Sequence, residues 1–352
     1  MIPWVYRCLR AYPLDQVPSE VRDQLRILTR QIGMRSLTLT GELLRVLDAM
    51  SKAGIHAVPF KGPILASLCY GDLALRECDD IDVLVPAKEV WRATELLQAH
   101  GYDFWLPTSK SDQMRLFRTG WAFTFAHHET QTHVDLHWKF TASGFSFPFG
   151  LEALWSRLKS IQLAGREVLS LPLQDVILLH CVHGAKHQWA RLEWVYALSG
   201  MLQSNPNLDW GELLRHAQRL RAERMLLLGV KLASDYFGTV LPKAIRQRVK
   251  DDQAIPSLVS QAQMRMVSQQ DKPVQEAEHY AFRFRVRERW RDRIRYFIYL
   301  VRLKAAPTAK DHEAIPLPAL LSALYYLARP FRLAHTYGLS PLKRFFRLLR
   351  SD

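Results

Sequence analysis

The sequence predicts an α+β fold: a mixed sheet with flanking helices, followed by a mainly helical C-terminal domain. Segments with strand and helix periodicity interleave up to about residue 170, whereas mostly helical periodicity follows Leu171. Of the 352 residues, 48% are hydrophobic, which is enough for a sizeable buried core. We therefore expect a helical extension over 1–55, an α/β domain over 56–170, and a helical domain with a basic C-terminal segment over 171–352.

The first half alternates between helical and extended patterns. Residues 19–51 repeat apolar side chains at helical spacing; Ser19 is a candidate cap and Gly54 ends the pattern. Further helices are expected at 64–70 and 87–99. Alternating or continuous apolar runs predict strands over 56–60, 79–85, 102–106, 121–127 and 132–140. A polar turn at 128–131 would join the last two strands.

The second half is helical by its periodicity. Helices are expected at 172–187, 191–203, 210–219, 222–237, 257–268, 280–304 and 317–329, with a loop over 305–316. The segment 282–304 would form an amphipathic helix. Its apolar stripe consists of Val286, Trp290, Ile294, Phe297 and Val301. Its basic row consists of Arg283, Arg287, Arg291 and Arg295. Such a helix either contacts a membrane surface or nucleic acid, or packs its stripe on the core and solvates its basic side. We favour the second interpretation.

Charge and cysteine content restrict the function classes. Lys and Arg number 48 against 34 Asp and Glu, a net charge of +14, which favours polyanionic partners or a solvated basic face. Nucleic acid and a peripheral membrane contact stay open, but no nucleic-acid-binding motif is present. The four cysteines form no CxxC pair, which argues against a zinc ribbon and suits a reducing, cytoplasmic location. No apolar run is long enough to predict a membrane-spanning helix.

Paired carboxylates on one predicted strand are the main chemical signal. In DDIDVLV (79–85), Asp80 and Asp82 are two residues apart and project from the same face, while apolar residues cover the other face. In HVDLHW (133–138), Asp135 lies on the polar face of a later strand. Three converging carboxylates could bind Mg²⁺ or Mn²⁺ for phosphoryl or nucleotidyl transfer. A solvated polar strand face is the alternative interpretation.

These motifs resemble a known superfamily. FKGPILASLCYGDLALRECDDIDVLV (60–85) followed by VDLHW (134–138) is similar to the DNA polymerase beta-like nucleotidyltransferases, most of all to a bacterial family of uncharacterised nucleotidyltransferases. The resemblance extends over about 20–340, through LLHCVHGAKHQWARLEW (178–194) and YYLARPFRLAHTYG (325–338). The chain departs from the pattern at Lys61-Gly62, where Gly-Ser is usual, in the longer interval from Gly62 to Asp80, and at Ala197, where we expect an acidic residue.

The resemblance implies a nucleotidyltransferase-type sheet and a metal-dependent reaction. NMP would move from an NTP, with ATP as one candidate, to a hydroxyl or phosphate of an unidentified acceptor. The acceptor class would be a peptide, a polysaccharide or a small molecule of specialised metabolism. Phosphoryl transfer would use the same site. A non-catalytic nucleotide- or polyanion-binding protein that keeps the fold is the alternative.

The resemblance also implies roles for individual residues. Asp80 and Asp82 would bind the metal, and Asp135 would complete one metal site and accept the proton of the attacking hydroxyl. Residues expected near the nucleotide are Lys61, Gly62, Arg76, His137, His183, His187 and Arg191.

Each of these residues has a structural interpretation as well. Lys61-Gly62 also fits an ordinary strand-to-helix turn, Arg76 a surface arginine, and His137 a hydrogen-bonded structural histidine. His180, His183 and His187 share a helix face, beside Lys186, but no acidic or cysteine partner is evident, so zinc is not expected. Packing against Trp189 and Trp194 is their alternative role.

Overall fold

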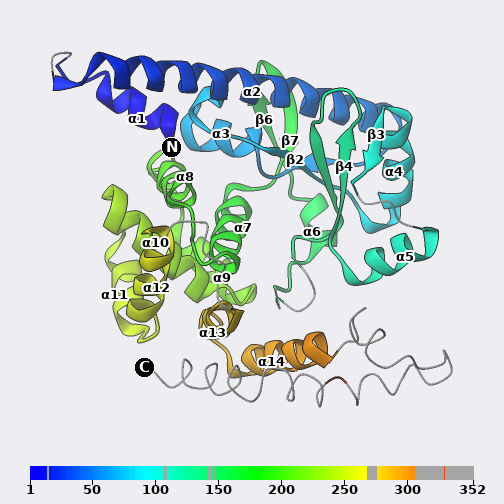
Figure 1. Ribbon diagram of the computed structural model, residues 1–352. Helices are drawn as coiled ribbons and strands as arrows, with labels where there is room; N and C mark the ends of the chain where they lie inside the picture. Colours follow the sequence, from blue (N-terminus) through cyan, green and yellow to red (C-terminus); the bar gives the residue numbers. More distant parts are fainter. Residues whose placement is uncertain are drawn as a thin grey trace.

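The fold is a five-stranded mixed sheet covered by helices and joined to a helical second half (Figure 1). The computed structural model describes residues 1–13, 16–105, 109–141, 145, 147–267, 276–305 and 329. The strands run in the order β1 (Val58–Pro59), β2 (Asp80–Leu84), β5 (His133–His137), β4 (Ala122–His127) and β3 (Tyr102–Phe104). β2 and β5 are parallel, and the other neighbours are antiparallel.

Helices and a small hairpin surround this sheet. In the first half they are α1 (Ile2–Leu9), α2 (Ser19–Lys52), α3 (Pro63–Tyr70), α4 (Val90–Ala99), α5 (Lys110–Thr119) and α6 (Leu151–Trp155), with 3₁₀ turns at Leu73–Leu75 and Ala87–Glu89. The hairpin consists of β6 (Lys159–Leu163) and β7 (Arg166–Ser170). The second half contains α7 (Leu173–Lys186), α8 (Leu192–Gln203), α9 (Trp210–Arg219), α10 (Glu223–Phe237), α11 (Lys243–Asp251), α12 (Ile255–Val267), α13 (Glu276–Arg285) and α14 (Trp290–Ala305).

The predicted α+β class and the five expected strands are confirmed. The division into three parts stays a proposal. Ser19 begins α2, but the predicted side-chain cap is wrong: Pro18 is the N-cap and no side chain bonds the helix start. Sequence periodicity missed α1, α5, α6, α11 and the β6–β7 hairpin. The expected loop over 305–316 and helix over 317–329 lie outside the described residues, apart from Arg329 and from Ala305, which is the last residue of α14 and not part of a loop.

The predicted helix over 280–304 is two helices, and the preferred role of its apolar stripe is wrong. The chain leaves helical geometry between Arg285 and Trp290, so the residues after the break present a different face. Val286 is buried, but the later stripe residues are exposed, Trp290 by 65%. Asp292, Tyr296 and Leu300 are buried in their place. No helix in the described part of the chain is long and apolar enough to cross a membrane.

The two faces of β2 belong to different hydrophobic clusters. Ile81 and Val83 pack in a cluster with residues of α2 and α4, including Leu43 and Leu97. Leu84 belongs instead to the cluster built mainly by α7, α8, α10 and α12. Because side chains alternate along a strand, Asp80 and Asp82 lie on the Leu84 face, toward the helical half. The predicted separation of polar and apolar faces therefore positions the carboxylates between the two halves.

Helix α7 is held in place by a buried aspartate at its start and a buried tryptophan at its end. Asp175 is fully buried and pairs with Arg157, 3.0 Å away, and with His216 of α9. Trp189 follows α7 and is fully buried. Its ring packs against Gly184, in the space that a side chain would otherwise fill. A methyl group at Gly184 would come within 2.5 Å of the Trp189 ring. The position of α7 thus depends on a glycine that leaves room for an indole.

We expect Gly184→Ala to destabilise the protein, because the new methyl group must displace a close-packed ring. Overpacking of this kind typically costs about 1–3 kcal/mol. Gly41→Ala is the matched control: Gly41 lies in α2 with nothing within 4 Å of an added Cβ, so better helix propensity should stabilise the fold by about 0.5–1 kcal/mol. Urea unfolding of both variants measures the two effects. Equal stabilities for Gly184→Ala and wild type would contradict this packing.

Candidate metal centre and the pocket beside it

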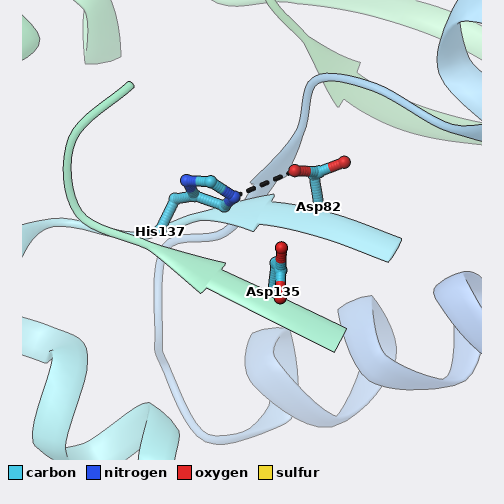
Figure 2. Close-up of side chains that lie close together, drawn as sticks. All are labelled: Asp82, Asp135 and His137. Atoms are coloured by element: carbon cyan, nitrogen blue, oxygen red, sulfur yellow. Dashed lines mark hydrogen bonds and ion pairs between the residues drawn. The ribbon is translucent and has the colours of Figure 1, made fainter. Parts of the chain in front are cut away.

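Three potential metal ligands meet on the parallel pair β2–β5. The register places Asp82 directly opposite Asp135, and His137 follows two residues later on the same face. One ligand atom from each of the three side chains lies within 4.8 Å of the other two. Figure 2 shows the three side chains together on one face of the two strands. The parallel pairing therefore brings together side chains from two separate sequence motifs, with His137 in the place expected for Asp80.

Asp82 is the buried centre of this group, with 2% of its surface exposed. Its Oδ1 accepts hydrogen bonds from Lys61 Nζ at 2.7 Å and from His137 Nε2 at 2.9 Å. Burial alone would raise the pKa of Asp82, but the Lys61 charge and the His137 hydrogen bond outweigh it and hold that pKa well below its usual value. Burial would likewise lower the pKa of Lys61, yet Asp82 raises it above its usual value. Both groups are therefore ionised at neutral pH.

His137 is oriented by its second ring nitrogen. Nδ1 lies 3.3 Å from the Lys139 carbonyl oxygen, which can only accept a hydrogen bond. Because Nε2 donates to Asp82, it could bind a metal only if the metal replaced that hydrogen bond and the ring proton moved to Nδ1, toward the Lys139 oxygen. The ring also packs edge-on against Phe60, with centroids 4.9 Å apart. His137 is thus fixed by the fold, and it becomes a nitrogen ligand only by giving up its bond to Asp82.

Asp135 and Asp80 differ in their surroundings. Thr124 Oγ1 of β4 donates a hydrogen bond of 2.6 Å to Asp135 Oδ1, which leaves Oδ2 for another contact. Asp80 is not one of the three clustered ligands, although it lines the same pocket as Asp135. Burial and the nearby charge of Asp82 raise the pKa of Asp80 to about 6. A bound cation would lower that pKa, because it favours the charged carboxylate.

The ligand set fits a divalent ion. Carboxylate oxygens suit Mg²⁺ and Mn²⁺, and imidazole nitrogen suits transition metals better than Mg²⁺. Asp82 and Asp135 provide carboxylates from neighbouring strands, with His137 beside them. The predicted set of Asp80, Asp82 and Asp135 therefore shares two members with the closest cluster.

A pocket of about 280 Å³ lies beside the candidate metal centre, between the sheet and α7. Cationic, acidic and aromatic side chains line it together. Seven of the predicted site residues are among them: Lys61, Arg76, Asp80, Asp135, His137, His183 and His187. Asp82 is more deeply buried and is not a lining residue. The chain thus brings most of its predicted site residues to one cavity from segments that are far apart in sequence.

Lys186 and Arg76 add positive charge to this pocket. Lys186 Nζ lies 4.9 Å from the centre of the Trp121 ring, also in the pocket wall. Burial and the nearby Arg283 lower the pKa of Lys186 to about 8. Arg76 Nη1 donates to the Gly62 carbonyl oxygen at 3.1 Å and lies 3.5 Å from Cys78 Sγ. Arg76 is therefore a fixed part of the wall.

His180 and His183 of α7 and His187, its C-cap, have different environments. His180 is buried and bonds the Trp194 carbonyl oxygen through Nε2 at 2.8 Å. His183 and His187 line the pocket, and their rings lie 4.9 and 5.7 Å from that of Trp194. Burial lowers the pKa of His187 to about 3 and that of His180 to about 4, so both are neutral at pH 7. His183 and His187 therefore both pack against Trp194 and line the pocket.

Gly62 and Arg191 are not among the residues that line the pocket. Gly62 has a φ of +58° and precedes α3, and an added Cβ would lie 3.0 Å from the Asp80 carbonyl oxygen. Pro63 follows and contributes no N–H to the helix start. Arg191 Nη1 pairs with Glu193 at 3.3 Å. Their roles near a nucleotide stay predictions.

Sequence reasoning missed two residues around the centre, Thr124 and Trp121. Thr124 lies opposite Asp135 in the antiparallel register of β4 and β5. The polar Thr within the apolar run WAFTFAH was a usable signal, because the run was already expected to form a hairpin with the Asp135 strand. Trp121 had no comparable signal, because its neighbour Lys186 comes from the second half of the chain.

Comparison with known proteins gives one match. A family model described as an uncharacterised nucleotidyltransferase matches residues 1–238. The matched range contains every predicted site residue, and it ends before 325–338, where the expected resemblance stays a prediction. No curated protein and no solved structure gives a significant match.

We expect Gly62→Ala to weaken divalent-metal binding at Asp82 and to destabilise the protein by about 1–3 kcal/mol. The methyl group is disfavoured at the positive φ and also pushes against the backbone of Asp80. Gly54→Ala is the control, because Gly54 also has a positive φ, +65°, but nothing lies within 4 Å of its added Cβ. Thermal unfolding and Mn²⁺ titration separate the two effects. Equal Mn²⁺ affinity in both variants would contradict a role for the Gly62–Asp80 contact.

Proposed function

The chain belongs to the family of uncharacterised nucleotidyltransferases, and from this premise we propose that it moves NMP from an NTP to a hydroxyl or phosphate of an acceptor. The observation that carries the proposal is the parallel β2–β5 register, which sets Asp82 opposite Asp135 beside a pocket with cationic walls. The oxygen of the acceptor would attack the α-phosphorus, the bond from that phosphorus to the bridging oxygen would break, and pyrophosphate would leave.

In this proposal the aspartates bind Mg²⁺ or Mn²⁺. Asp82 and Asp135 would hold the ion with Asp80, and His137 would orient Asp82 or join as a ligand. Bound metal would stabilise the negative charge that builds up on the transferred phosphate. Asp135 Oδ2 would accept the proton of the attacking hydroxyl, since Thr124 already donates to Oδ1. Catalysis would rest on positioning and charge neutralisation.

The remaining pocket residues would hold the nucleotide. Lys61, Arg76 and Lys186 would neutralise the phosphates, because all three line the pocket that contains Asp80 and Asp135. His183 and His187 are neutral and packed on Trp194, so they would contact the less charged part of the nucleotide. Gly62 would act through the loop backbone, and Arg191 would approach only from the rim.

The wider setting of the reaction is also a proposal. The acceptor would be a peptide, a polysaccharide or a small molecule of specialised metabolism. The four cysteines are free thiols, which supports a cytoplasmic location. We further propose that the α/β part over 56–170 carries the metal centre, while the helical part from 171 onward closes the pocket through α7.

One observation favours a non-catalytic function as the alternative. Lys61 already neutralises Asp82 at 2.7 Å, so the carboxylate group has a partner without metal. A nucleotide- or polyanion-binding protein could keep this arrangement. Calorimetry with each NTP, with and without Mg²⁺, distinguishes the two functions: binding independent of divalent metal, without transfer to any component of a cell extract, would favour the alternative.

We expect Asp80→Asn, Asp82→Asn and Asp135→Asn each to lower NMP transfer by about a hundredfold or more, because each removes a negative charge from the metal centre. Incubation with each labelled NTP, Mg²⁺ and host-cell extract, followed by the mass of the labelled product, measures the transfer. Asp103→Asn is the control, because Asp103 is an exposed strand carboxylate outside the pocket. Full activity in any of the three variants, with unchanged thermal stability, would refute the assignment of that aspartate.

We expect nucleotide affinity to fall as the pH rises through about 8. Below that pH Lys186 is charged and attracts phosphate; above it the side chain loses the proton, because burial and Arg283 have lowered its pKa. Lys186→Arg should remove this pH dependence, since an arginine keeps its charge throughout the range. Calorimetric titration with an NTP and Mg²⁺ between pH 7 and about 9 tests this. A pH profile that is the same in wild type and Lys186→Arg would exclude Lys186 as a phosphate contact.

A further inference from the structure

The Lys61 ammonium lies on a carboxylate that a divalent cation at the candidate centre would also use. The Lys61 ammonium is 2.7 Å from Asp82 Oδ1, the oxygen that His137 Nε2 also contacts. Only 2% of the Asp82 surface is exposed to solvent. A metal ion on a carboxylate oxygen sits at about 2.0–2.1 Å for Mg²⁺. An ammonium on that carboxylate and a doubly charged ion would therefore be a few ångströms apart and would repel each other strongly. Lys61 and a metal ion would therefore compete for the Asp82 carboxylate.

Lys61 also has an alternative partner within reach. Its side chain is 30% exposed, and it lines the pocket with Arg76 and Lys186. Triphosphate oxygens in that pocket would offer the ammonium a new anionic partner while the metal takes Asp82. In this exchange Asp82 has a positive partner before and after nucleotide binding, so no buried carboxylate is left uncompensated.

We propose that Lys61 is an exchangeable counterion of Asp82, which weakens divalent-metal binding to the free protein and gives way to the metal when the nucleotide binds. This inference rests on the proposed nucleotidyltransferase function. It assigns Lys61 a positioning role and makes metal and nucleotide binding mutually dependent. Because such coupling is reciprocal, the nucleotide tightens metal binding by the same factor as the metal tightens nucleotide binding.

Mn²⁺ binding without nucleotide tests the exchange directly, by electron paramagnetic resonance of free Mn²⁺. We expect Lys61→Met to bind Mn²⁺ alone at least about tenfold more tightly than wild type, a factor within the usual range of coupling. Adding NTP should tighten Mn²⁺ binding in wild type and much less in Lys61→Met. Lys61→Arg keeps the charge and should resemble wild type in the absence of nucleotide.

Two further variants serve as controls. Lys186→Met removes one positive charge from the same pocket but no contact with Asp82, so it should change the affinity for Mn²⁺ alone far less than Lys61→Met. Adding Asp82→Asn to Lys61→Met should abolish the gain. Circular dichroism confirms that each variant is folded at the assay temperature.

The outcomes separate this inference from the proposed function. If Lys61→Met binds Mn²⁺ no more tightly than wild type, or Lys186→Met gains as much, the exchange is overturned even where NMP transfer is observed. If Lys61→Met gains Mn²⁺ affinity but wild type transfers no NMP from any NTP, the counterion exchange stands and the proposed reaction fails.

Discussion

Burial of the Asp82 carboxylate is the constraint around which the site is organised. A carboxylate out of water costs several kcal/mol unless positive charge and hydrogen bonds compensate it. Lys61, from the turn before α3, and His137, from β5, supply both at 2.7 and 2.9 Å. The three residues belong to different segments, so the compensation exists only when β2 pairs with β5 and the Lys61 turn docks beside them. The contacts that stabilise the buried Asp82 carboxylate also hold the potential metal ligands close together.

The second half of the chain completes the pocket by covering it. Helix α7 and its C-cap bring His183, Lys186 and His187 to the pocket that Asp80 and Asp135 also line. Its position depends on Asp175 at one end and on the fit of Trp189 against Gly184 at the other. Both contacts fix α7, the helix that carries His183 and Lys186 of the pocket wall. Packing in the helical core is thereby linked to the electrostatics of the pocket.

Acidic and basic groups balance each other in this pocket. Asp80 and Asp135 line a cavity of about 280 Å³ together with three cations, Lys61, Arg76 and Lys186, and Lys61 also bonds the more deeply buried Asp82. The environment shifts individual groups in opposite directions, since it raises the pKa of Asp80 to about 6 and lowers that of Lys186 to about 8. A metal and a triphosphate together bring both signs of charge. Such a pair would fit the pocket better than either one alone, which is the physical basis of the proposed exchange at Lys61.

The sequence by itself determined the α+β class, the five strands of the main sheet, and the strand face that carries the carboxylates, because period-two alternation is a local property. It also pointed to the family through motifs within residues 60–85 and 134–138. Only the tertiary structure decided that Asp82 aligns with Asp135, that Thr124 and Lys139 hold the centre, and that Lys61 contacts Asp82. It also corrected the apolar stripe of α14, since a short break in the helix turned that stripe to solvent. Register, burial and long-range pairing depend on which segments meet, and periodicity in one segment carries no information about its partner.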